Sequence, residues 1–91
     1  MERYQILFKG QIQSVGFRAF CKYIAIEYNL TGSARNLDDF EYVEVELQGE
    51  KSNILRAISK INKGNMFIKV TDYQMKKIKT IENDLNFSIK Y

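Results

Sequence analysis

The segment Tyr42-Val43-Glu44-Val45-Glu46-Leu47-Gln48-Gly49 has the most regular pattern in this chain. Its apolar and polar residues alternate with a period of two, which is typical of a strand that lays one face on an apolar core. The pattern predicts a strand over residues 42–48 that ends at Gly49. The inward residues would be Val43, Val45 and Leu47. The open face would carry Glu44, Glu46 and Gln48.

Two other segments, one before this strand in the sequence and one after it, have apolar residues at helical spacing. The first predicts a helix over about residues 17–29, and its apolar stripe consists of Phe17, Cys21, Ile24, Ala25 and Tyr28. The second follows Gly49, with Ser52 as a candidate N-cap and Gly64 as the stop signal. The apolar stripe of the second helix consists of Ile54, Leu55, Ile58 and Ile61.

Weaker patterns predict the remaining strands and one turn. Strands are expected over residues 3–10 and near 31–36. A further strand is expected over 66–77, where Met66, Ile68 and Val70 alternate with other residues, and a last one over 85–90 with Phe87 and Ile89 inward. The aspartates of residues 37–40 favour a turn. The order is β-α-β-β-α-β, in which the fourth strand region can divide in two. It predicts an α+β ferredoxin-like sandwich, an antiparallel sheet with two helices on one face.

Composition narrows the chemistry that one domain over residues 1–91 can perform. The chain has no histidine and one cysteine, Cys21, so neither a Ser/His/Asp nor a Cys/His catalytic unit can be built. We expect no metal and no cofactor, and we expect Cys21 to pack as a small apolar residue. The net charge of +3 is small for a dedicated nucleic-acid binder. No apolar run has signal-peptide or membrane-spanning length, which predicts a cytoplasmic location.

The loop from Gly10 to Arg18 joins the first strand to the first helix. A tight loop that enters a helix points backbone N–H groups into one concavity, where the helix dipole adds positive potential. Arg18 lies in the first helical turn, where its charge opposes that dipole unless an anion is bound. From these features alone the loop is either an anion cradle or a turn that carries a solvated arginine.

Sequence motifs decide between the two interpretations. The loop resembles the acylphosphatase signature Gly-x-Val-Gln-Gly-Val-Gly-Phe-Arg through Gly10, Gln13, Val15, Gly16, Phe17 and Arg18. The family element Gly-x-Val-x-Asn has a counterpart in residues 32–36, and the ending Phe-x-Ile-x-Tyr has one in residues 87–91. The resemblance therefore extends over the whole chain and implies the ferredoxin-like fold.

The resemblance also implies an activity, the hydrolysis of acyl phosphates to a carboxylate and inorganic phosphate. Arg18 would bind the phosphoryl group, and Asn36 would orient the attacking water unless it is only a turn residue. The backbone that would close around the phosphoryl oxygens is that of Ser14, Val15, Gly16, Phe17 and Arg18. Inorganic phosphate or sulfate would compete with the small-molecule substrate. We expect a monomer that binds neither nucleic acid nor membrane.

Three departures from the family pattern qualify this expectation. Ser14 stands where the family has glycine, Phe40 stands in the turn where glycine is common, and the Gly-Pro pair before the fourth strand is missing. A catalytically weak or silent domain that binds an anion or a protein is therefore the alternative. An RNA-binding module shares the element order, but its stacking aromatics would here be replaced by Glu44, Glu46 and Gln48.

Overall fold

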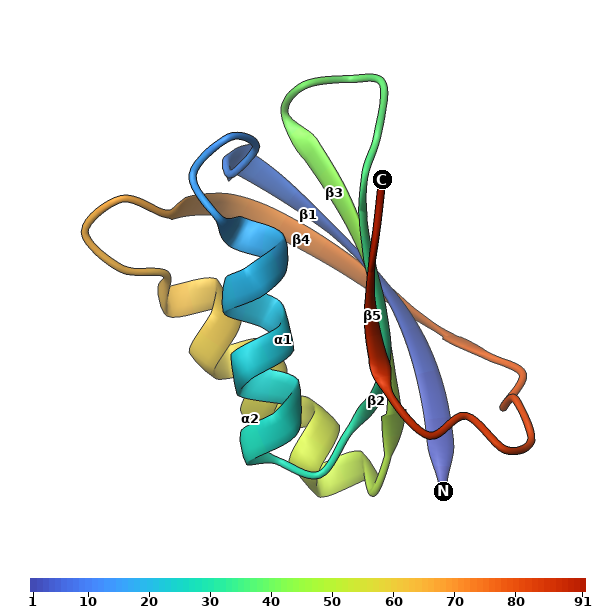
Figure 1. The fold of residues 1–91 in the computed structure, drawn as a ribbon. Coiled ribbons are helices and arrows are strands. Elements are labelled where there is room, and N and C mark those ends of the chain that lie inside the picture. The colour runs from blue at the N-terminus through green and yellow to red at the C-terminus, as the bar shows by residue number, and fades with distance from the viewer.

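The computed structural model describes residues 1–91 and consists of two helices packed on one face of a five-stranded sheet (Figure 1). The elements are β1 (Glu2–Gln11), α1 (Phe17–Glu27), β2 (Thr31–Asn36), β3 (Tyr42–Gly49), α2 (Lys51–Lys63), β4 (Lys69–Ile78) and β5 (Phe87–Lys90). The strand order is β4-β1-β3-β2-β5. This arrangement confirms the predicted ferredoxin-like sandwich, with the fourth strand region divided into β4 and β5.

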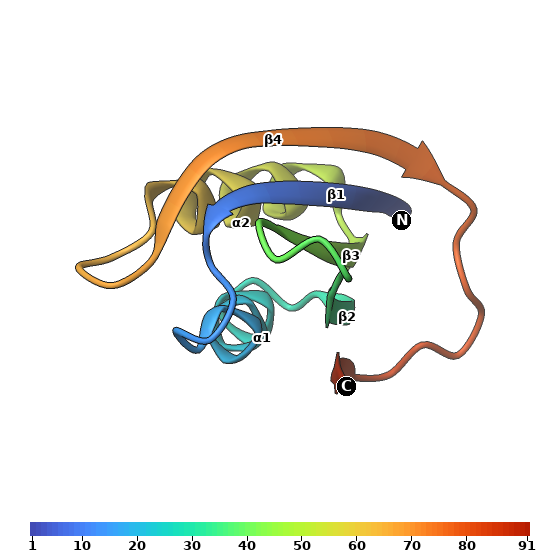
Figure 2. The ribbon, with the colours of Figure 1, turned by 90° about the horizontal axis from the view of Figure 1, so that it is seen from above.

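The sheet is antiparallel except at one edge, where β5 lies parallel to β2. The expectation of a wholly antiparallel sheet is therefore wrong at this pair. The topology explains the exception, because β4 is antiparallel to β1 whereas β2 has the same direction as β1. A chain that turns back after β4 and joins the far edge must then run parallel to β2. Residues 79–86 make this passage, arching past the strand ends from one edge to the other (Figure 2).

The inner face of the sheet forms the core with the two helices. The residues Val43, Val45 and Leu47 of β3 are completely buried there, as the alternation predicts. The buried stripe of α2 differs from the predicted one at one position. Leu55 is 45% exposed, and Ala57 is buried in its place. Residues at i and i+3 share a helix face, so Ile54 pairs with Ala57 and the adjacent Leu55 turns away.

Helix ends differ from the prediction by one or two residues. α1 ends at Glu27, because Asn29 adopts a left-handed φ of 57°. α2 begins at Lys51 with Glu50 as its N-cap, so Ser52 lies inside the helix and is not the cap. Gly64 ends α2 as predicted, at a φ of 63°.

The segment after Gly64 corrects the predicted start of the fourth strand. The side chain of Asn65 accepts hydrogen bonds from the backbone N–H groups of Phe67 and Ile68 at 2.8 and 2.9 Å, which folds the segment into a turn. Met66 therefore lies before β4, which begins at Lys69, and is 80% exposed, whereas Ile68 is buried.

The outer face of the sheet is partly covered by residues 79–86, which we call the strap. Arg3 is 3% exposed, and its guanidinium donates to Glu46 on β3 and to Asp84 on the strap, both at 2.8 Å. Burial opposes the charge of Arg3, but the hydrogen bonds to Asp84 and Glu46 outweigh it and raise the pKa of Arg3 above its ordinary value. These bonds fix the strap and therefore the position at which β5 enters the sheet.

Gln48 lies on the same outer face but is buried, contrary to the expected open position. Its side chain donates to the carbonyl of Ile81 at 2.9 Å and accepts from the N–H of Ile81 at 2.8 Å. The strap thus replaces water as the partner of this amide.

Candidate active site

The loop between β1 and α1 is shaped by two residues in the left-handed region. Ser14 has a φ of 66° and Gly16 has a φ of 78°. The left-handed backbone conformation is unfavourable for any residue that has a Cβ atom, whereas glycine adopts it freely. The conformation at Ser14 is therefore strained. The loop leaves β1 beside Gly10, where an added Cβ would collide with the carbonyl oxygen of Lys69. Glycine at position 10 therefore allows β1 and β4 to approach closely next to the loop.

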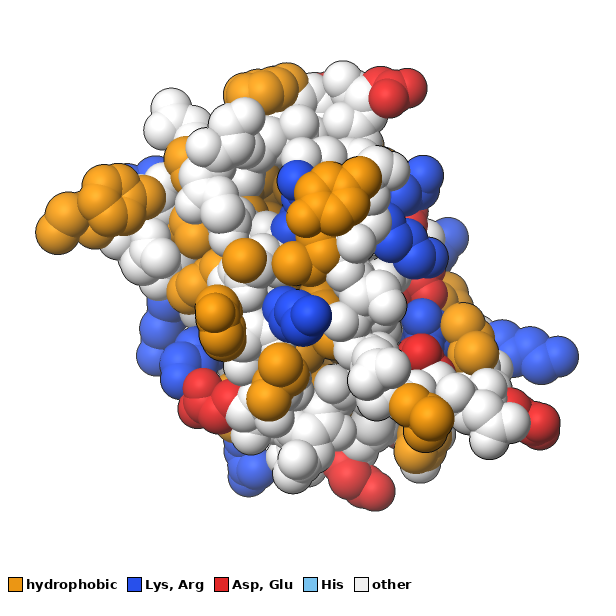
Figure 3. Space-filling view, in the orientation of Figure 1, with side chains coloured by type: hydrophobic (Ala, Val, Ile, Leu, Met, Phe, Trp, Pro, Cys, Tyr) orange, Lys and Arg blue, Asp and Glu red, His pale blue; other side chains and the backbone are white.

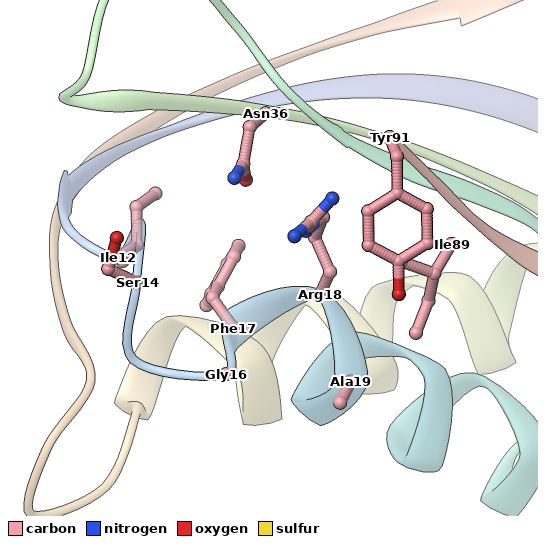
Figure 4. Close-up of a pocket in the computed structure, with 9 residues that line it drawn as sticks. All are labelled: Ile12, Ser14, Gly16, Phe17, Arg18, Ala19, Asn36, Ile89 and Tyr91. Carbon is pink, nitrogen blue, oxygen red and sulfur yellow. The ribbon is translucent and has the colours of Figure 1, made fainter.

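A cavity of about 220 Å³ opens where this loop meets the carboxyl end of β2 and the end of the chain (Figure 4). Its lining comes from three separate segments of the sequence. The lining residues are Ile12, Ser14, Gly16, Phe17, Arg18, Ala19, Asn36, Ile89 and Tyr91. None of the lining side chains is a carboxylate, and Arg18 provides the only charged side chain of the lining.

The amino end of α1 faces this cavity without a side-chain cap. Gly16 is the N-cap residue, and the first turn contains no acidic residue. The first helical hydrogen bond runs from the N–H of Phe20 to the carbonyl of Gly16 at 3.0 Å. The preceding N–H groups have no carbonyl partner within the helix. Together with the dipole and the charge of Arg18 they give the amino end of α1 the donors and the positive potential that suit an anion.

The guanidinium of Arg18 is held by the end of the chain. Its Nη1 atom donates to the carbonyl oxygen of Lys90 at 2.8 Å. Its central carbon lies 4.6 Å from the centre of the Tyr91 ring, which is within the range of a cation–π contact. Figure 3 shows apolar and cationic side chains together on the face where α1 meets β5. The two contacts leave the other guanidinium nitrogens available for a ligand.

Asn36 reaches the cavity from the last position of β2. It is paired with Val43 and lies two residues after the buried Ala34, which places both side chains on the inner face of the sheet. In Figure 4 the Asn36 amide points into the space between Arg18 and the Ser14 loop. The amide can donate and accept hydrogen bonds but cannot remove a proton at any working pH.

Gln13 connects the loop between β1 and α1 to the turn that follows Asn36. Its side-chain nitrogen lies within hydrogen-bonding distance of the carbonyl oxygens of Leu37 at 2.9 Å, Asp39 at 3.2 Å and Tyr42 at 2.8 Å. The two segments that carry Arg18 and Asn36 are therefore joined by side-chain bonds as well as by the sheet.

Most of the residues predicted from the sequence meet in one place. Ser14, Gly16, Phe17, Arg18 and Asn36 all line the cavity. The side chain of Val15 does not, because it lines a second cavity of about 410 Å³ together with Gln13 and Phe40. Only the backbone of Val15 belongs to the predicted cradle.

The end of the chain belongs to this site although the sequence predicted no role for it. Lys90 and Tyr91 contact Arg18, and Ile89 and Tyr91 line the cavity. A signal was present, since the ending over residues 87–91 matches a family motif. The parallel placement of β5 beside β2 turns that motif into part of the site.

Cys21 plays no part in this site. Its side chain is fully buried, and burial raises the pKa of its thiol far above the ordinary value. It is therefore a packed core residue, as its place on the helix stripe predicts. The structure contains no group of three or more acidic or cysteine side chains arranged to hold a metal ion. Neither helix is long and apolar enough to cross a membrane.

Comparisons with known proteins point to one family. The acylphosphatase family model matches residues 4–89. An acylphosphatase of Clostridium acetobutylicum is 44% identical over 91 residues, which are 100% of this chain and 99% of that protein. An acylphosphatase of Clostridium beijerinckii is 41% identical over 100% of both chains. The crystal structure of acylphosphatase from Bacillus subtilis superposes with a TM-score of 0.92 over 100% of both chains, at 33% identity.

Proposed function

Because the chain belongs to the acylphosphatase family, we propose that its cavity at the amino end of α1 removes the phosphoryl group from acyl phosphates. The observation that carries this proposal is that Arg18 and Asn36 line one cavity together with Ser14, Gly16 and Phe17 of the loop. An acyl phosphate is a small molecule, and the family implies a substrate of that size.

In the proposed reaction the phosphoryl oxygens bind to the N–H groups of the loop and to the free nitrogens of Arg18. These donors stabilise the charge that spreads over the equatorial oxygens in the transition state. Water attacks phosphorus, a new oxygen–phosphorus bond forms, and the bond between phosphorus and the acyl oxygen breaks. Its electron pair stays on the carboxylate that leaves. The proton of the water goes to a phosphate oxygen or to solvent.

We assign to Asn36 the orientation of the attacking water. Its amide stands across the cavity from the loop, and an amide can hold water in line with the leaving group without taking its proton (Figure 4). Carboxylate is a good leaving group, so a strong general base is not needed. This assignment accounts for catalysis in a chain without histidine.

We further propose that residues 1–91 act as one domain and as a monomer in the cytoplasm, with inorganic phosphate or sulfate as competing anions. The test of the proposed activity is hydrolysis of benzoyl phosphate beside p-nitrophenyl phosphate as a monoester control. We expect turnover of the first and not of the second. Binding of phosphate without turnover of benzoyl phosphate would instead indicate a silent anion-binding domain.

A further inference from the structure

The turn between α2 and β4 projects two large apolar side chains into solvent. Met66 is 80% exposed and Phe67, its neighbour in the sequence, is 70% exposed. Figure 3 shows apolar side chains that stand out from the molecule at its left edge, where this turn lies in Figure 1. Neither residue lines the candidate active site. We call Met66 and Phe67 the apolar tip.

The exposure of the apolar tip is built into the turn. The side chain of Asn65 accepts from the N–H groups of Phe67 and Ile68, and the backbone N–H of Asn65 donates to the carbonyl of Ile68 at 3.2 Å. A Cβ atom added at Gly64 would collide with the same carbonyl oxygen, so this close approach requires glycine. Ile68 enters the core at 2% exposure, and the turn holds the two preceding side chains outside it.

Cationic side chains line the helix that leads to the apolar tip. Arg56, Lys60 and Lys63 stand at positions i, i+4 and i+7 of α2, which places them on one face of the helix. They line a hollow of about 400 Å³ together with Tyr28 and Ser59, and none of the lining side chains is a carboxylate. Figure 3 shows cationic side chains on the same edge of the molecule as the projecting apolar ones. We call Arg56, Lys60 and Lys63 the cationic stripe.

Acidic residues are missing from this whole part of the sequence. Residues 51–71 contain none of the 11 acidic residues of the chain, but they contain the cations Lys51, Arg56, Lys60, Lys63 and Lys69. One carboxylate reaches the stripe from α1, because Glu27 accepts a hydrogen bond from Lys60 at 2.9 Å. Arg56, Lys63 and Lys69 form no ion pair. Lys60 and Lys63 also complement the dipole at the end of α2, but the dipole accounts for neither Arg56 nor the exposed tip.

We propose that the apolar tip and the cationic stripe form a docking surface for a membrane that contains anionic lipids. Met66 and Phe67 enter the boundary between headgroups and acyl chains, where removal of apolar surface from water favours binding. Arg56, Lys63 and Lys69 lie at the headgroups, whose negative surface potential attracts them. The expectation that the chain binds no membrane rested on the lack of a spanning segment, which peripheral contact of this kind does not need.

The shape and the charge of this surface favour a bilayer over other occupants. The tip projects from the molecule, so a protein partner would need a pocket that matches both side chains, whereas a fluid bilayer needs no such match (Figure 1, Figure 3). A second copy of the chain would bring like charges together. Nucleic acid would pair with the stripe through its phosphates but would leave Met66 in water. The surface lies apart from the candidate active site, so the inference does not depend on the proposed function.

The experiment measures sedimentation of the protein with vesicles of equal parts phosphatidylglycerol and phosphatidylcholine, beside vesicles of phosphatidylcholine alone. We expect binding to the anionic vesicles that weakens as salt is raised, and much weaker binding to the neutral ones. The double variant Met66→Ser, Phe67→Ser should bind the anionic vesicles at least about 10-fold more weakly, the factor expected for exposing one large apolar side chain. Lys63→Gln should weaken binding by about 5-fold, the loss expected for one cation at an anionic surface.

Two variants on the strap are matched controls. Leu85→Ser removes a side chain that is 80% exposed, as that of Met66 is, and Lys79→Gln removes an exposed cation. Both positions follow the far end of β4, away from the apolar tip (Figure 1). Neither control should change the binding of anionic vesicles. All four proteins should retain the Tm and the benzoyl phosphate hydrolysis of the parent, because the changes lie on the surface outside the candidate active site.

Three results would overturn the proposal. If the parent does not sediment with anionic vesicles at low salt, the surface does not bind lipid. If the double variant binds these vesicles as the parent does, attraction is due to charge alone and the tip does not insert. If duplex DNA or polyglutamate binds the parent in a way that depends on Lys63 while vesicles do not, the partner of the stripe is nucleic acid or an acidic protein.

Discussion

Replacement of Ser14 by glycine should stabilise the protein and improve its anion site. Ser14 has a φ of 66°. For a residue that has a Cβ atom, this left-handed conformation is unfavourable by about 1–2 kcal/mol. Glycine removes that cost but loses about 0.4–1 kcal/mol through the greater freedom of the unfolded chain. With the middle of each range, the difference is a gain of about 0.8 kcal/mol in the free energy of unfolding. In a domain of this size a gain of about 0.8 kcal/mol raises Tm by roughly 3–6 °C.

The assay is thermal unfolding of the parent and of Ser14→Gly, followed by the inhibition constant of phosphate and kcat/KM for benzoyl phosphate. We expect a higher Tm together with tighter phosphate binding or a higher kcat/KM, because the exposed Ser14 side chain lines the cavity. Ser59→Gly is the matched control. Ser59 is exposed in α2, where glycine lowers the stability of a helix by up to about 1 kcal/mol. The Tm of the Ser59→Gly protein should therefore fall. A Ser14→Gly protein with weaker phosphate binding and lower kcat/KM would refute the reasoning and identify the hydroxyl as a ligand contact.

Three further predictions concern the anion, the metal and the thiol. Inorganic phosphate at 100 times its Kd should stabilise the protein by about 2.7 kcal/mol, and Arg18→Ala should abolish most of the resulting rise in Tm; equal stabilisation of both proteins would exclude Arg18 as the phosphoryl anchor. Hydrolysis of benzoyl phosphate should continue undiminished in excess chelator, and restoration of a lost rate by a divalent ion would contradict the metal-free mechanism. Cys21 should react with a thiol reagent only after unfolding, because its thiol is fully buried and its pKa is raised; rapid labelling of the folded protein would contradict that packing.

Local patterns predicted the elements that pack by local rules. The alternation of Val43, Val45 and Leu47 identified a buried strand face, and Gly64 identified a helix end, because period and backbone freedom depend on neighbouring residues alone. The apolar pattern misplaced Met66, since the turn that exposes it depends on hydrogen bonds from the side chain of Asn65.

Long-range contacts account for what the sequence did not predict. Gln48 is buried by the strap, whose residue Ile81 lies 33 positions away in the chain. The parallel pairing of β5 with β2 follows from the same passage of the chain around the sheet. It brings Tyr91 to Arg18, which no pattern of period two or 3.6 can indicate. Arg18 was a candidate from its place at the start of a helix, but its pairing with Asn36 was predicted only through the family motifs, because the residues between them give no sign that the two side chains share a cavity.

The division of roles between Arg18 and Asn36 is tested most directly by one paired measurement. The Kd of inorganic phosphate and the kcat for benzoyl phosphate are determined for the parent, Arg18→Ala and Asn36→Ala. We expect Arg18→Ala to lose phosphate binding. Asn36→Ala should bind phosphate almost as the parent does but turn over roughly 10²-fold more slowly, because it no longer holds the water in line. An Asn36→Ala protein with the turnover of the parent would contradict the account and reduce Asn36 to a residue of the turn.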